Sequence, residues 1–335
     1  MSDENSLGDT SHPTLEPPVS VILTVVNEAV HLEESVNAVL SSDYSGQVEI
    51  AIAVGPSKDK TLEIAQALST RNSSIKVIEN PTGRTPEGLN LAISATKNPI
   101  IVRIDGHSAI QPNYIREAVR TLKETGAVNV GGLMAAEGIT PFQRAVARAM
   151  RSPIGVGASR FHTGGSAGSV DTVYLGVFKR SAVIAVGGYD ARFTRAQDWE
   201  LNFRLRKQGG LIWFNPNLNV IYRPRATMKA LAKQYFEYGR WRAVVSRHHK
   251  GTTNFRYLAP PINLLIHLFS ILLGTLISPI FFIPTVIYLS AITISALFIG
   301  KSWTERFLLP VVLIIMHFSW GFGFITSPRA LISNS

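Results

Sequence analysis

The chain has 335 residues, of which 46% are hydrophobic and only 17% are charged, and its net charge is +10. This composition excludes a disordered, highly charged protein, because such chains contain too few apolar side chains to form a core. The sequence contains no cysteine. This absence also excludes a disulfide-held secreted domain and every cysteine-based zinc or iron–sulfur site.

The charges divide the chain into three regions. Residues 1–222 carry no net charge, whereas residues 223–256 contain nine lysines and arginines against one acidic residue, Glu237, for a net charge of +8. Residues 258–335 contain only four charged side chains and have a net charge of +2. This order predicts a catalytic or binding domain, then a segment at a membrane surface, then a membrane anchor.

The expected organisation follows these changes in composition. We expect a flexible tail at 1–18, a catalytic domain at 19–224, a basic interfacial segment at 225–257 and a transmembrane region at 258–335. The tail has neither a basic start nor an apolar stretch, so it does not resemble a signal peptide.

Strands and helices are expected to alternate in the first part of the chain. Apolar runs rich in β-branched residues predict buried strands at 19–26, 48–54, 75–79 and 100–104. Helices are predicted at 31–40, 59–69, 86–95 and 112–124. This alternation is typical of an α/β fold with a mostly parallel sheet, whose ligands bind at the carboxyl ends of the strands. Polar residues follow three of these ends: Asn27, Ser57 and Asp105.

The sequence from 126 to 224 is less regular. Short strands are predicted near Gly131 and at 172–178 and 211–214, and a helix at 198–208 is expected to end at Gly209-Gly210. Residues 160–170 are rich in Gly, Ser and Thr, which predicts a mobile loop.

Three apolar stretches follow, at about 260–278, 280–300 and 307–326. About 20 apolar residues cross a bilayer core, so these predict a multi-pass membrane protein, although the short first stretch leaves two spans plus a re-entrant segment open. Lys301 and Arg306 lie between the second and third stretches, and the positive-inside rule places that loop and the catalytic domain in the cytoplasm. With three spans, the C-terminus is expected outside.

Asp105-Gly106-His107 is a candidate cation site. An Asp at a strand end and a His two residues later place two ligand-type side chains on one side of a turn. A divalent cation can be held there against a diphosphate, since Mg²⁺ prefers one or two carboxylates plus phosphate oxygens and Mn²⁺ also tolerates imidazole. The alternative is an ordinary Asp-Gly turn with an exposed His.

Asp198 lies at the start of the predicted helix at 198–208, and the residues alone favour a helix N-cap. The alternative is a general base, because a carboxylate within hydrogen-bond reach can deprotonate a sugar hydroxyl.

Aromatic and basic residues alternate in 234–242, directly before the apolar stretches. This pattern predicts an interfacial helix on anionic lipid, and it is compatible with Arg240 or Arg242 binding a diphosphate. Nucleic-acid binding is disfavoured because the basic segment adjoins the predicted spans.

Taken in chain order, these features resemble glycosyltransferase family 2, whose members carry a GT-A fold with a mostly parallel sheet. The resemblance covers about residues 18–250 and depends on an ordered set of motifs. These are Asn27-Glu28, Ser57-Lys58-Asp59-Lys60-Thr61, Gly83-Arg84, Asp105-Gly106-His107, Gly187-Gly188-Tyr189-Asp190 and Gln197-Asp198. The version of these motifs with Arg103-Ile104-Asp105-Gly106-His107, Gln234-Tyr235-Phe236 and a short membrane tail is most similar to the succinoglycan-type exopolysaccharide glucosyltransferases of bacteria.

The resemblance implies transfer of a sugar from a nucleotide donor with inversion. It implies Mn²⁺ or Mg²⁺ held by Asp105 and His107, and Asp198 as the base, which reverses the preference for a cap. The implied donor contacts are Val26, Asn27, Glu28, Ser57, Asp59, Arg84, Asp105 and Gly106. The implied acceptor or diphosphate contacts are Gln197, Trp199, Gln234, Arg240 and Trp241.

Three departures from the family pattern refine this expectation. Val54-Gly55 stand where many members have Asp-Asp, so the contact to the nucleotide base must differ. His107 replaces the second Asp of the metal motif, as in the succinoglycan-type subgroup. Glu237, rather than Gln, lies three residues before Arg240-Trp241, which argues against a processive synthase and for addition of single sugars.

We therefore expect a membrane-anchored enzyme that transfers a single sugar to a lipid-linked saccharide in cell-surface or exopolysaccharide synthesis, with partners in a polysaccharide assembly pathway. One alternative is a transferase that acts on polyprenyl phosphate itself. A second is a non-catalytic membrane scaffold with a decayed nucleotide pocket. A dehydrogenase is disfavoured because no G-x-G-x-x-G follows a predicted strand.

Overall fold

The computed structural model describes residues 16–332. Its strands are β1 (Val19–Val25), β2 (Val48–Val54), β3 (Ile75–Glu79), β4 (Ile100–Arg103), β5 (Asn129–Ala136), β6 (Gly168–Ser169), β7 (Tyr174–Lys179) and β8 (Ile212–Tyr222). The helices before the basic segment are α1 (Leu32–Leu40), α2 (Thr61–Arg71), α3 (Thr85–Ser94), α4 (Tyr114–Thr125), α5 (Pro141–Met150), α6 (Pro153–Val156), α7 (Arg160–Thr163), α8 (Arg180–Ala185) and α9 (Gln197–Lys207).

The basic segment and the apolar region are helical. They form α10 (Met228–His248), α11 (Phe255–Leu276), η1 (Pro279–Phe282), α12 (Ile283–Ile299), α13 (Trp303–Ile325) and η2 (Arg329–Leu331). Most of the tail predicted at 1–18 lies outside the described residues.

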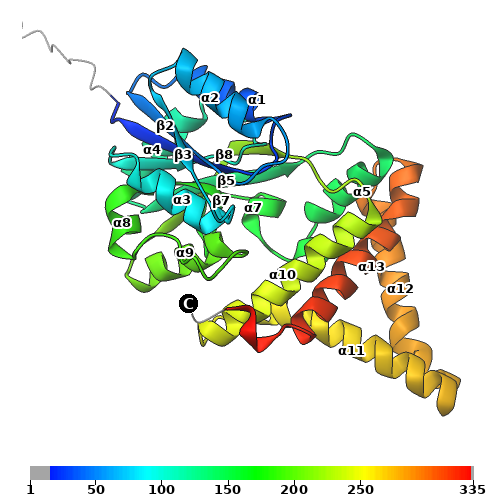
Figure 1. The fold of residues 1–335 in the computed structure, drawn as a ribbon. Coiled ribbons are helices and arrows are strands. Elements are labelled where there is room, and N and C mark those ends of the chain that lie inside the picture. Colours follow the sequence, from blue (N-terminus) through cyan, green and yellow to red (C-terminus); the bar gives the residue numbers. More distant parts are fainter. Residues whose placement is uncertain (1–15, 333–335) are drawn as a thin grey trace, which may run out of the picture.

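The strands form one mixed sheet in the order β3-β2-β1-β4-β7-β5-β8-β6 (Figure 1). The first four strands are parallel to one another, and β5 and β8 form a second parallel pair. By contrast, β7 runs antiparallel to β4 and β5, and β6 runs antiparallel to β8. The predicted mostly parallel sheet is therefore confirmed, and β1 to β4 lie within one residue of their predicted ranges.

Helices cover both faces of the sheet, because its strands are apolar on both sides. On one face, α1, α2 and α4 contribute Leu32, Leu68 and Ile115 to the core. On the other, α3, α8 and α9 contribute Leu89, Val183 and Leu201. The result is a three-layer α/β/α domain in which the carboxyl ends of β1, β2 and β4 meet at one edge.

The irregular middle of the chain departs from the prediction. Residues 160–170, expected to be a mobile loop, contain the short helix α7 and the short strand β6. Strand β8 continues well beyond the predicted 211–214, because its pairing with β5 shifts register between Gly131 and Leu133 and so passes Asn215 and Pro216. Helix α5 was not predicted, although its capping box of Thr140 and Gln143 is a recognised start signal.

The apolar region contains three helices, α11, η1 with α12, and α13, that are long and apolar enough to cross a membrane by length and composition. They lie beyond α10 on the side away from most of the sheet (Figure 1). Each begins one to five residues before its predicted start, as expected because helix boundaries are the least certain part of such a prediction.

Candidate active site

The loops that follow β1 and β2 are joined by hydrogen bonds. Asn27 has a left-handed backbone (φ 55°), which asparagine tolerates better than most residues. Its N–H donates to Ser57 Oγ at 3.1 Å, and its side-chain oxygen accepts from the Lys58 N–H at 2.7 Å. Asp59 accepts the N–H of Ala29 at 3.1 Å. The side chains of Ser57 and Asp59 therefore fix the loop after β1.

Val26 lies where the segments after β2 and β3 meet. A β-carbon on Gly55 would lie 2.7 Å from Val26 Cγ2 and 2.7 Å from Gly83 Cα. Because this close approach leaves no room for a side chain, the backbone explains why an aspartate is absent at position 55. Arg84 follows at the N-cap of α3, where its guanidinium pairs with Glu87.

The turn after β4 brings Asp105, Gly106 and His107 to the loop after β1. His107 Nδ1 lies 2.9 Å from Glu28 Oε1. This bond to Glu28 raises the pKa of His107, against the opposing effect of burial. Gly106 packs so closely on β1 that a β-carbon there would lie 2.5 Å from Val25 Cγ1. The predicted donor contact Glu28 and the predicted metal ligands are thus neighbours.

Arg103, the last residue of β4, connects two carboxylates that are far apart in the sequence. Its guanidinium donates to Asp105 Oδ1 at 3.0 Å and also to Asp198 Oδ1. The arginine is only 4% exposed. Burial opposes its charge, but the charge of Asp105 and its hydrogen bond raise the pKa of Arg103 above its usual value. The structure therefore places the candidate cation ligand and the candidate base on the same guanidinium.

Asp198 is not a helix cap. Helix α9 begins at Gln197, its N-cap is Ala196 with a left-handed backbone (φ 60°), and no side chain bonds the free N–H groups. The Asp198 carboxylate is bound to Arg103 instead. Its neighbour Trp199 packs against Arg242 of α10, whose guanidinium carbon lies 4.1 Å from the ring centroid.

The predicted acceptor residues of α10 are used in different ways. The Gln234 amide donates to Tyr222 and Tyr238, each at 2.8 Å, and its buried Oε1 has no protein partner. Arg240 pairs with Glu237 at 3.0 Å. Trp241 is 5% exposed and belongs to an apolar cluster with Phe193, Val244 and Val245. Gln234 therefore offers a free acceptor atom, whereas Trp241 is packed.

The family model for glycosyl transferase family 2 matches residues 20–187 of the chain. The chain belongs to glycosyl transferase family 2. This transferase is 32% identical over 242 residues to the succinoglycan biosynthesis protein ExoA of Rhizobium meliloti (strain 1021), covering 72% of this chain and 73% of that protein. The family and the exopolysaccharide-type resemblance expected from the sequence are confirmed.

Two further similarities cover nearly the whole transferase. It is 26% identical over 328 residues to a dolichyl N-acetyl-α-D-glucosaminyl phosphate 3-β-D-2,3-diacetamido-2,3-dideoxy-β-D-glucuronosyltransferase of Methanococcus voltae, covering 91% of this chain and 95% of that one. The solved mannosyltransferase PcManGT of Pyrobaculum calidifontis superposes with a TM-score of 0.58 at 17% identity, covering 91% and 87% of the two chains. The expected GT-A fold is confirmed.

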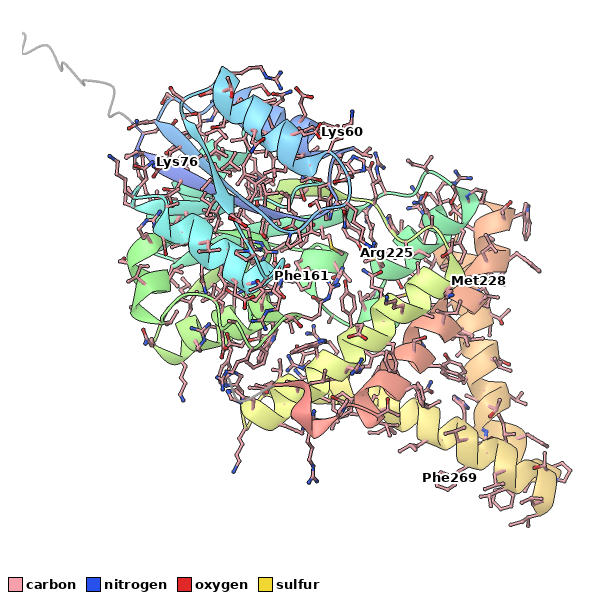
Figure 2. All side chains as sticks on the ribbon, in the orientation of Figure 1. Lys60, Lys76, Phe161, Arg225, Met228 and Phe269 are labelled. Atoms are coloured by element: carbon pink, nitrogen blue, oxygen red, sulfur yellow. The ribbon has the colours of Figure 1, made fainter. Side chains whose placement is uncertain are left out.

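Sequence reasoning missed the role of three arginines in this glycosyltransferase. Arg103 was noticed only as part of a motif, although a charged residue that ends a buried strand is itself a signal. Arg225 and Arg195 were not singled out. The charge of Arg225 acts on both His107 and Tyr238, and that of Arg195 acts on Tyr238. Figure 2 shows Arg225 between the sheet domain and the start of α10.

The donor atoms at the turn after β4 fit a divalent cation shared with a diphosphate. No group of three or more His, Asp or Glu side chains gathers to hold a metal within residues 16–332. Asp105 supplies a partly exposed carboxylate, and His107 has its second ring nitrogen free of the bond to Glu28. Two protein ligands are sufficient for a cation that takes its remaining ligands from phosphate and water.

Proposed function

We propose that this glycosyltransferase is an inverting enzyme that moves a single sugar from a nucleotide-sugar donor to a lipid-linked saccharide. The observation that carries the proposal is the arrangement around Arg103, which holds Asp105 and Asp198 together. A donor diphosphate near Asp105 would bring its sugar close to the Asp198 carboxylate, where the acceptor hydroxyl would attack.

The proposed reaction needs only one base. The acceptor oxygen forms a bond to the anomeric carbon while the bond from that carbon to the diphosphate breaks, so the configuration inverts. The hydroxyl proton passes to Asp198, and the nucleoside diphosphate leaves with the electron pair. Arg103 donates to the Asp198 carboxylate and so holds it in the position from which it would accept the proton.

The donor would lie over the loops after β1, β2 and β4. We propose that Val26, Asn27 and Glu28 contact the nucleoside, that Ser57 and Asp59 hold this loop, and that Arg84 lies at its edge. Asp105 and His107 would hold Mn²⁺ or Mg²⁺, which offsets the charge on the leaving diphosphate when bound. PcManGT was solved in complex with GDP-Man and Mn²⁺, which supports a nucleotide-sugar donor and a divalent cation here.

The proposed acceptor is a saccharide on a lipid diphosphate or phosphate. The net charge of +8 in residues 223–256 suits an anionic headgroup at a membrane surface. The Methanococcus voltae relative is named for transfer to a dolichyl-linked sugar phosphate, and the Rhizobium meliloti relative for succinoglycan biosynthesis. We propose that Gln197, Trp199, Gln234 and Arg240 lie on the acceptor side, in an enzyme that works with others of a polysaccharide assembly pathway.

We also propose a location and domain limits. The catalytic domain would comprise 19–224, the interfacial segment 225–257 and the membrane region 258–335, with the catalytic domain on the cytoplasmic face of the cell membrane. Lys301, in the loop before α13, and Arg306, in the first turn of that helix, support this orientation.

The base assignment is tested by Asp198→Asn, which removes the charge while keeping the shape. Turnover of a labelled nucleotide sugar should fall at least about 1,000-fold, whereas the donor-induced rise in melting temperature should persist. The matched control is Asp171→Asn, since Asp171 also pairs with an arginine, Arg206, but is 60% exposed at its side chain. Normal turnover in Asp198→Asn would show that another group is the base.

Product analysis separates the proposed acceptor from polyprenyl phosphate. Membranes supplied with labelled donor are extracted with organic solvent, and the lipid products are analysed by mass spectrometry. A sugar added to an existing lipid-linked saccharide supports the proposal, and a monosaccharide on polyprenyl phosphate contradicts it. A placed base favours the first outcome, because a phosphate oxygen needs no deprotonation.

A further inference from the structure

We infer that α13 does not cross the bilayer. The helix lies against the catalytic domain at both ends and in its middle, so only α11 and α12 enter the lipid. Residues 326–332 then lie on the same side of the membrane as the active site. The inference concerns topology alone and does not depend on the reaction proposed above.

The start of α13 is attached to α5 of the catalytic domain. Glu305 is 4% exposed, and its carboxylate lies 3.4 Å from Arg148 Nε and 3.7 Å from Arg144 Nε. Its other contact is the Lys301 N–H at 2.9 Å. A buried carboxylate needs such partners, so this end of α13 is tied to the catalytic side.

The middle of α13 contacts α6, which belongs to the same domain. His317 Nε2 lies 2.8 Å from the carbonyl oxygen of Ile154. Beside this bond, the Met316 side chain lies so close to Gly155 that a β-carbon there would be 3.1 Å away. The centre of a membrane-spanning helix would lie deep in lipid, where it could not reach this loop.

The end of α13 and the residues after it contact α10 and the start of α9, the helix that carries Asp198. Arg247 donates to Ser327 Oγ at 3.0 Å and to the Pro328 carbonyl at 2.9 Å, while Ser327 donates to the Arg240 carbonyl at 2.9 Å. Leu331 and Ile332 pack on the cluster that contains Phe193 and Trp241 and that Ala196 and Trp199 also border. The chain after α13 therefore lies beside the helix that carries Asp198.

Close backbone packing keeps α13 alongside α10. A β-carbon on Gly323 would lie 2.0 Å from the Phe236 carbonyl oxygen, and one on Gly239 would lie 2.0 Å from the Trp320 carbonyl oxygen. Figure 1 shows the two helices side by side. Helix α10 contains six charged side chains among its 21 residues, so it cannot cross a bilayer. A helix packed along it stays on the same side.

The length of α13 strengthens this conclusion. Its 23 residues extend about 35 Å at 1.5 Å per residue, enough to cross a hydrocarbon core of about 30 Å. A spanning orientation would therefore separate Glu305 and Ser327 by the membrane, whereas both contact residues of the catalytic side. Helix α13 is also the most buried of the three apolar helices: 33% of its apolar window is buried, against 22% for α11 and 11% for η1 with α12. Its exposed apolar side chains lie mainly near its two ends, among them Phe307 and Phe322.

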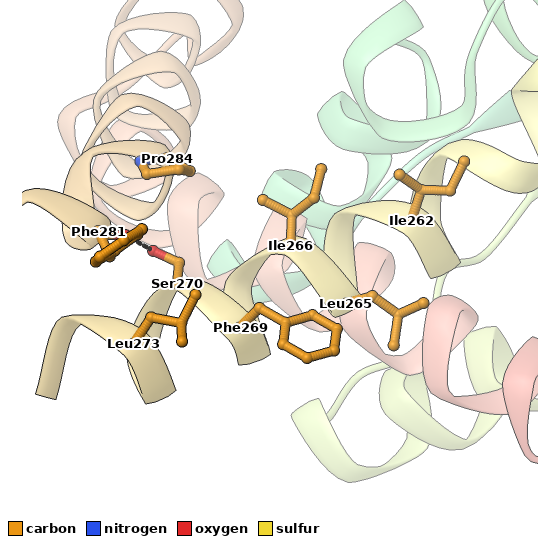
Figure 3. Close-up of a pocket in the computed structure, with 8 residues that line it drawn as sticks. All are labelled: Ile262, Leu265, Ile266, Phe269, Ser270, Leu273, Phe281 and Pro284. Carbon is orange, nitrogen blue, oxygen red and sulfur yellow. Dashed lines mark hydrogen bonds between the residues drawn. The ribbon is translucent and has the colours of Figure 1, made fainter. Parts of the chain in front are cut away.

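Most of the exposed apolar surface in the apolar region belongs to α11 and α12. Large apolar side chains on these two helices are widely exposed, among them Phe269 at 58% and Phe298 at 85%. An open groove of about 350 Å³ lies between them. Its lining residues, drawn in Figure 3, are Ile262, Leu265, Ile266, Phe269, Ser270, Leu273, Phe281 and Pro284. Its only hydroxyl, Ser270, donates to the Phe281 carbonyl at 2.6 Å. Such a surface suits acyl chains and not water.

This topology differs from the three spans expected from the sequence. Hydropathy and length treat α13 like its neighbours, and three spans place the C-terminus outside. Two spans return the chain to the catalytic side before Lys301, and α13 then remains there. Both topologies place the positively charged loop at Lys301 on the catalytic side, so the positive-inside rule does not distinguish them.

Cysteine labelling tests the inference directly, since the chain has no native cysteine. Arg329→Cys and Lys76→Cys would be placed singly in the full chain, both at exposed positions. Lys76 marks the catalytic side and lies far from Phe269 (Figure 2). Sealed right-side-out and inverted vesicles are treated with a membrane-impermeant maleimide. We expect both cysteines to react in the same vesicle orientation.

Reaction of Arg329→Cys in the orientation opposite to that of Lys76→Cys would overturn the inference. Failure of Arg329→Cys to react in either orientation would also overturn it, because the segment would then lie within the lipid.

A cross-link supplies a second measurement. The pair Ile154→Cys and His317→Cys should be joined by a short bismaleimide, since the parent residues touch. The control pair Ile154→Cys and Phe298→Cys should not be joined, because Phe298 faces lipid. Absence of the first cross-link, or an equal yield from both pairs, would contradict the packing of α13 on the catalytic domain.

Discussion

Two buried arginines lie on either side of the start of α9, and they are held in opposite ways. Arg103 is 4% exposed and binds the carboxylates of Asp105 and Asp198. Arg242 is 5% exposed, yet no carboxylate lies within ion-pair distance of it among the described residues. Its guanidinium carbon lies 4.1 Å from the Trp199 ring centroid and 3.4 Å from that of Tyr257.

The pKa values of the two arginines differ because their partners differ. Burial opposes the charge of Arg103, but the charge of Asp105 and its hydrogen bond outweigh burial and raise the pKa of Arg103. Burial lowers the pKa of Arg242 to about 10, because two ring faces and the Thr252 carbonyl at 2.7 Å compensate the charge less well. Arg242 nevertheless remains charged at neutral pH.

The different partners of Arg103 and Arg242 indicate different roles for the two guanidinium groups. Arg103 directs its charge at two groups that would touch the donor or the acceptor, so it is a positioning residue for the proposed chemistry. Arg242 uses its flat surface to join α9, α10 and the start of α11, so it is a packing residue. The first should control turnover, and the second should control stability.

The largest expected effect comes from Arg103→Leu. Without the guanidinium, Asp105 and Asp198 repel each other and lose their placement, so we expect kcat to fall by about 100- to 1,000-fold. Because the two carboxylates remain partly exposed to water, we expect the melting temperature to drop less than it would if they were fully buried. Steady-state kinetics with a labelled donor and thermal unfolding in detergent would measure both effects.

Arg103→Lys is the matched control, because it keeps the charge but not the two-pronged geometry. It should recover only part of the lost kcat while leaving KM for the donor nearly unchanged. If Arg103→Leu kept normal kcat, Arg103 would be only a structural residue and the contrast with Arg242 would disappear.

A smaller effect is expected for Arg242→Met, which retains an apolar stem but no guanidinium. Cation–π contacts contribute about 0.5–1 kcal/mol at exposed sites and about 2 kcal/mol or more when desolvated, so the free energy of unfolding should fall by about 2 kcal/mol or more. We expect kcat to change less than about threefold. Lys233→Met is a suitable control, since Lys233 is an exposed cation on the same helix. A collapse of kcat without loss of stability would show that Arg242 acts on substrate.

Much of the fold could be predicted from the sequence because its information is local. The apolar runs of β1 to β4 are stable when they are buried on both faces, in the middle of a parallel sheet. Asp105 directly follows one of these runs in the sequence, so its position after a strand end could be predicted. By contrast, strand β8 passes through Asn215 and Pro216, where local propensity indicates a turn. There the pairing with β5 and the bonds of the Asn215 amide to Thr121 and Glu117 decide the outcome.

The candidate site could be predicted only in part. Asp198 and Arg103 are 95 residues apart, and no local rule pairs them, so the cap and base interpretations could not be separated by sequence alone. The position of α13 could not be predicted for the same reason. Its composition suits lipid, but Gly323, His317 and Glu305 match surfaces of this particular domain, which only tertiary packing reveals.

The smallest expected effect concerns a third charge, Glu49, at the opposite edge of the sheet from the site. Its carboxylate accepts from the Ser20 hydroxyl at 2.7 Å and from the N–H groups of Lys97 and Asn98 at 2.8 and 3.0 Å. Burial alone would raise the pKa of Glu49, but these bonds outweigh it and lower the pKa below its usual value.

Because the folded-state pKa is depressed, Glu49 stabilises the fold above its unfolded pKa of about 4.3, and this contribution is lost as the pH falls through the lower folded value. Glu49→Gln should therefore cost about 1 kcal/mol at pH 7 and progressively less below pH 4. Chemical unfolding at both pH values would measure the difference, with Glu79→Gln, at the exposed end of β3, as the control. Since Glu49 is remote from Arg103, kcat should stay normal. A fall in kcat as large as that of Arg103→Leu would mean that charge anywhere in the sheet controls turnover, and the special role of Arg103 would be lost.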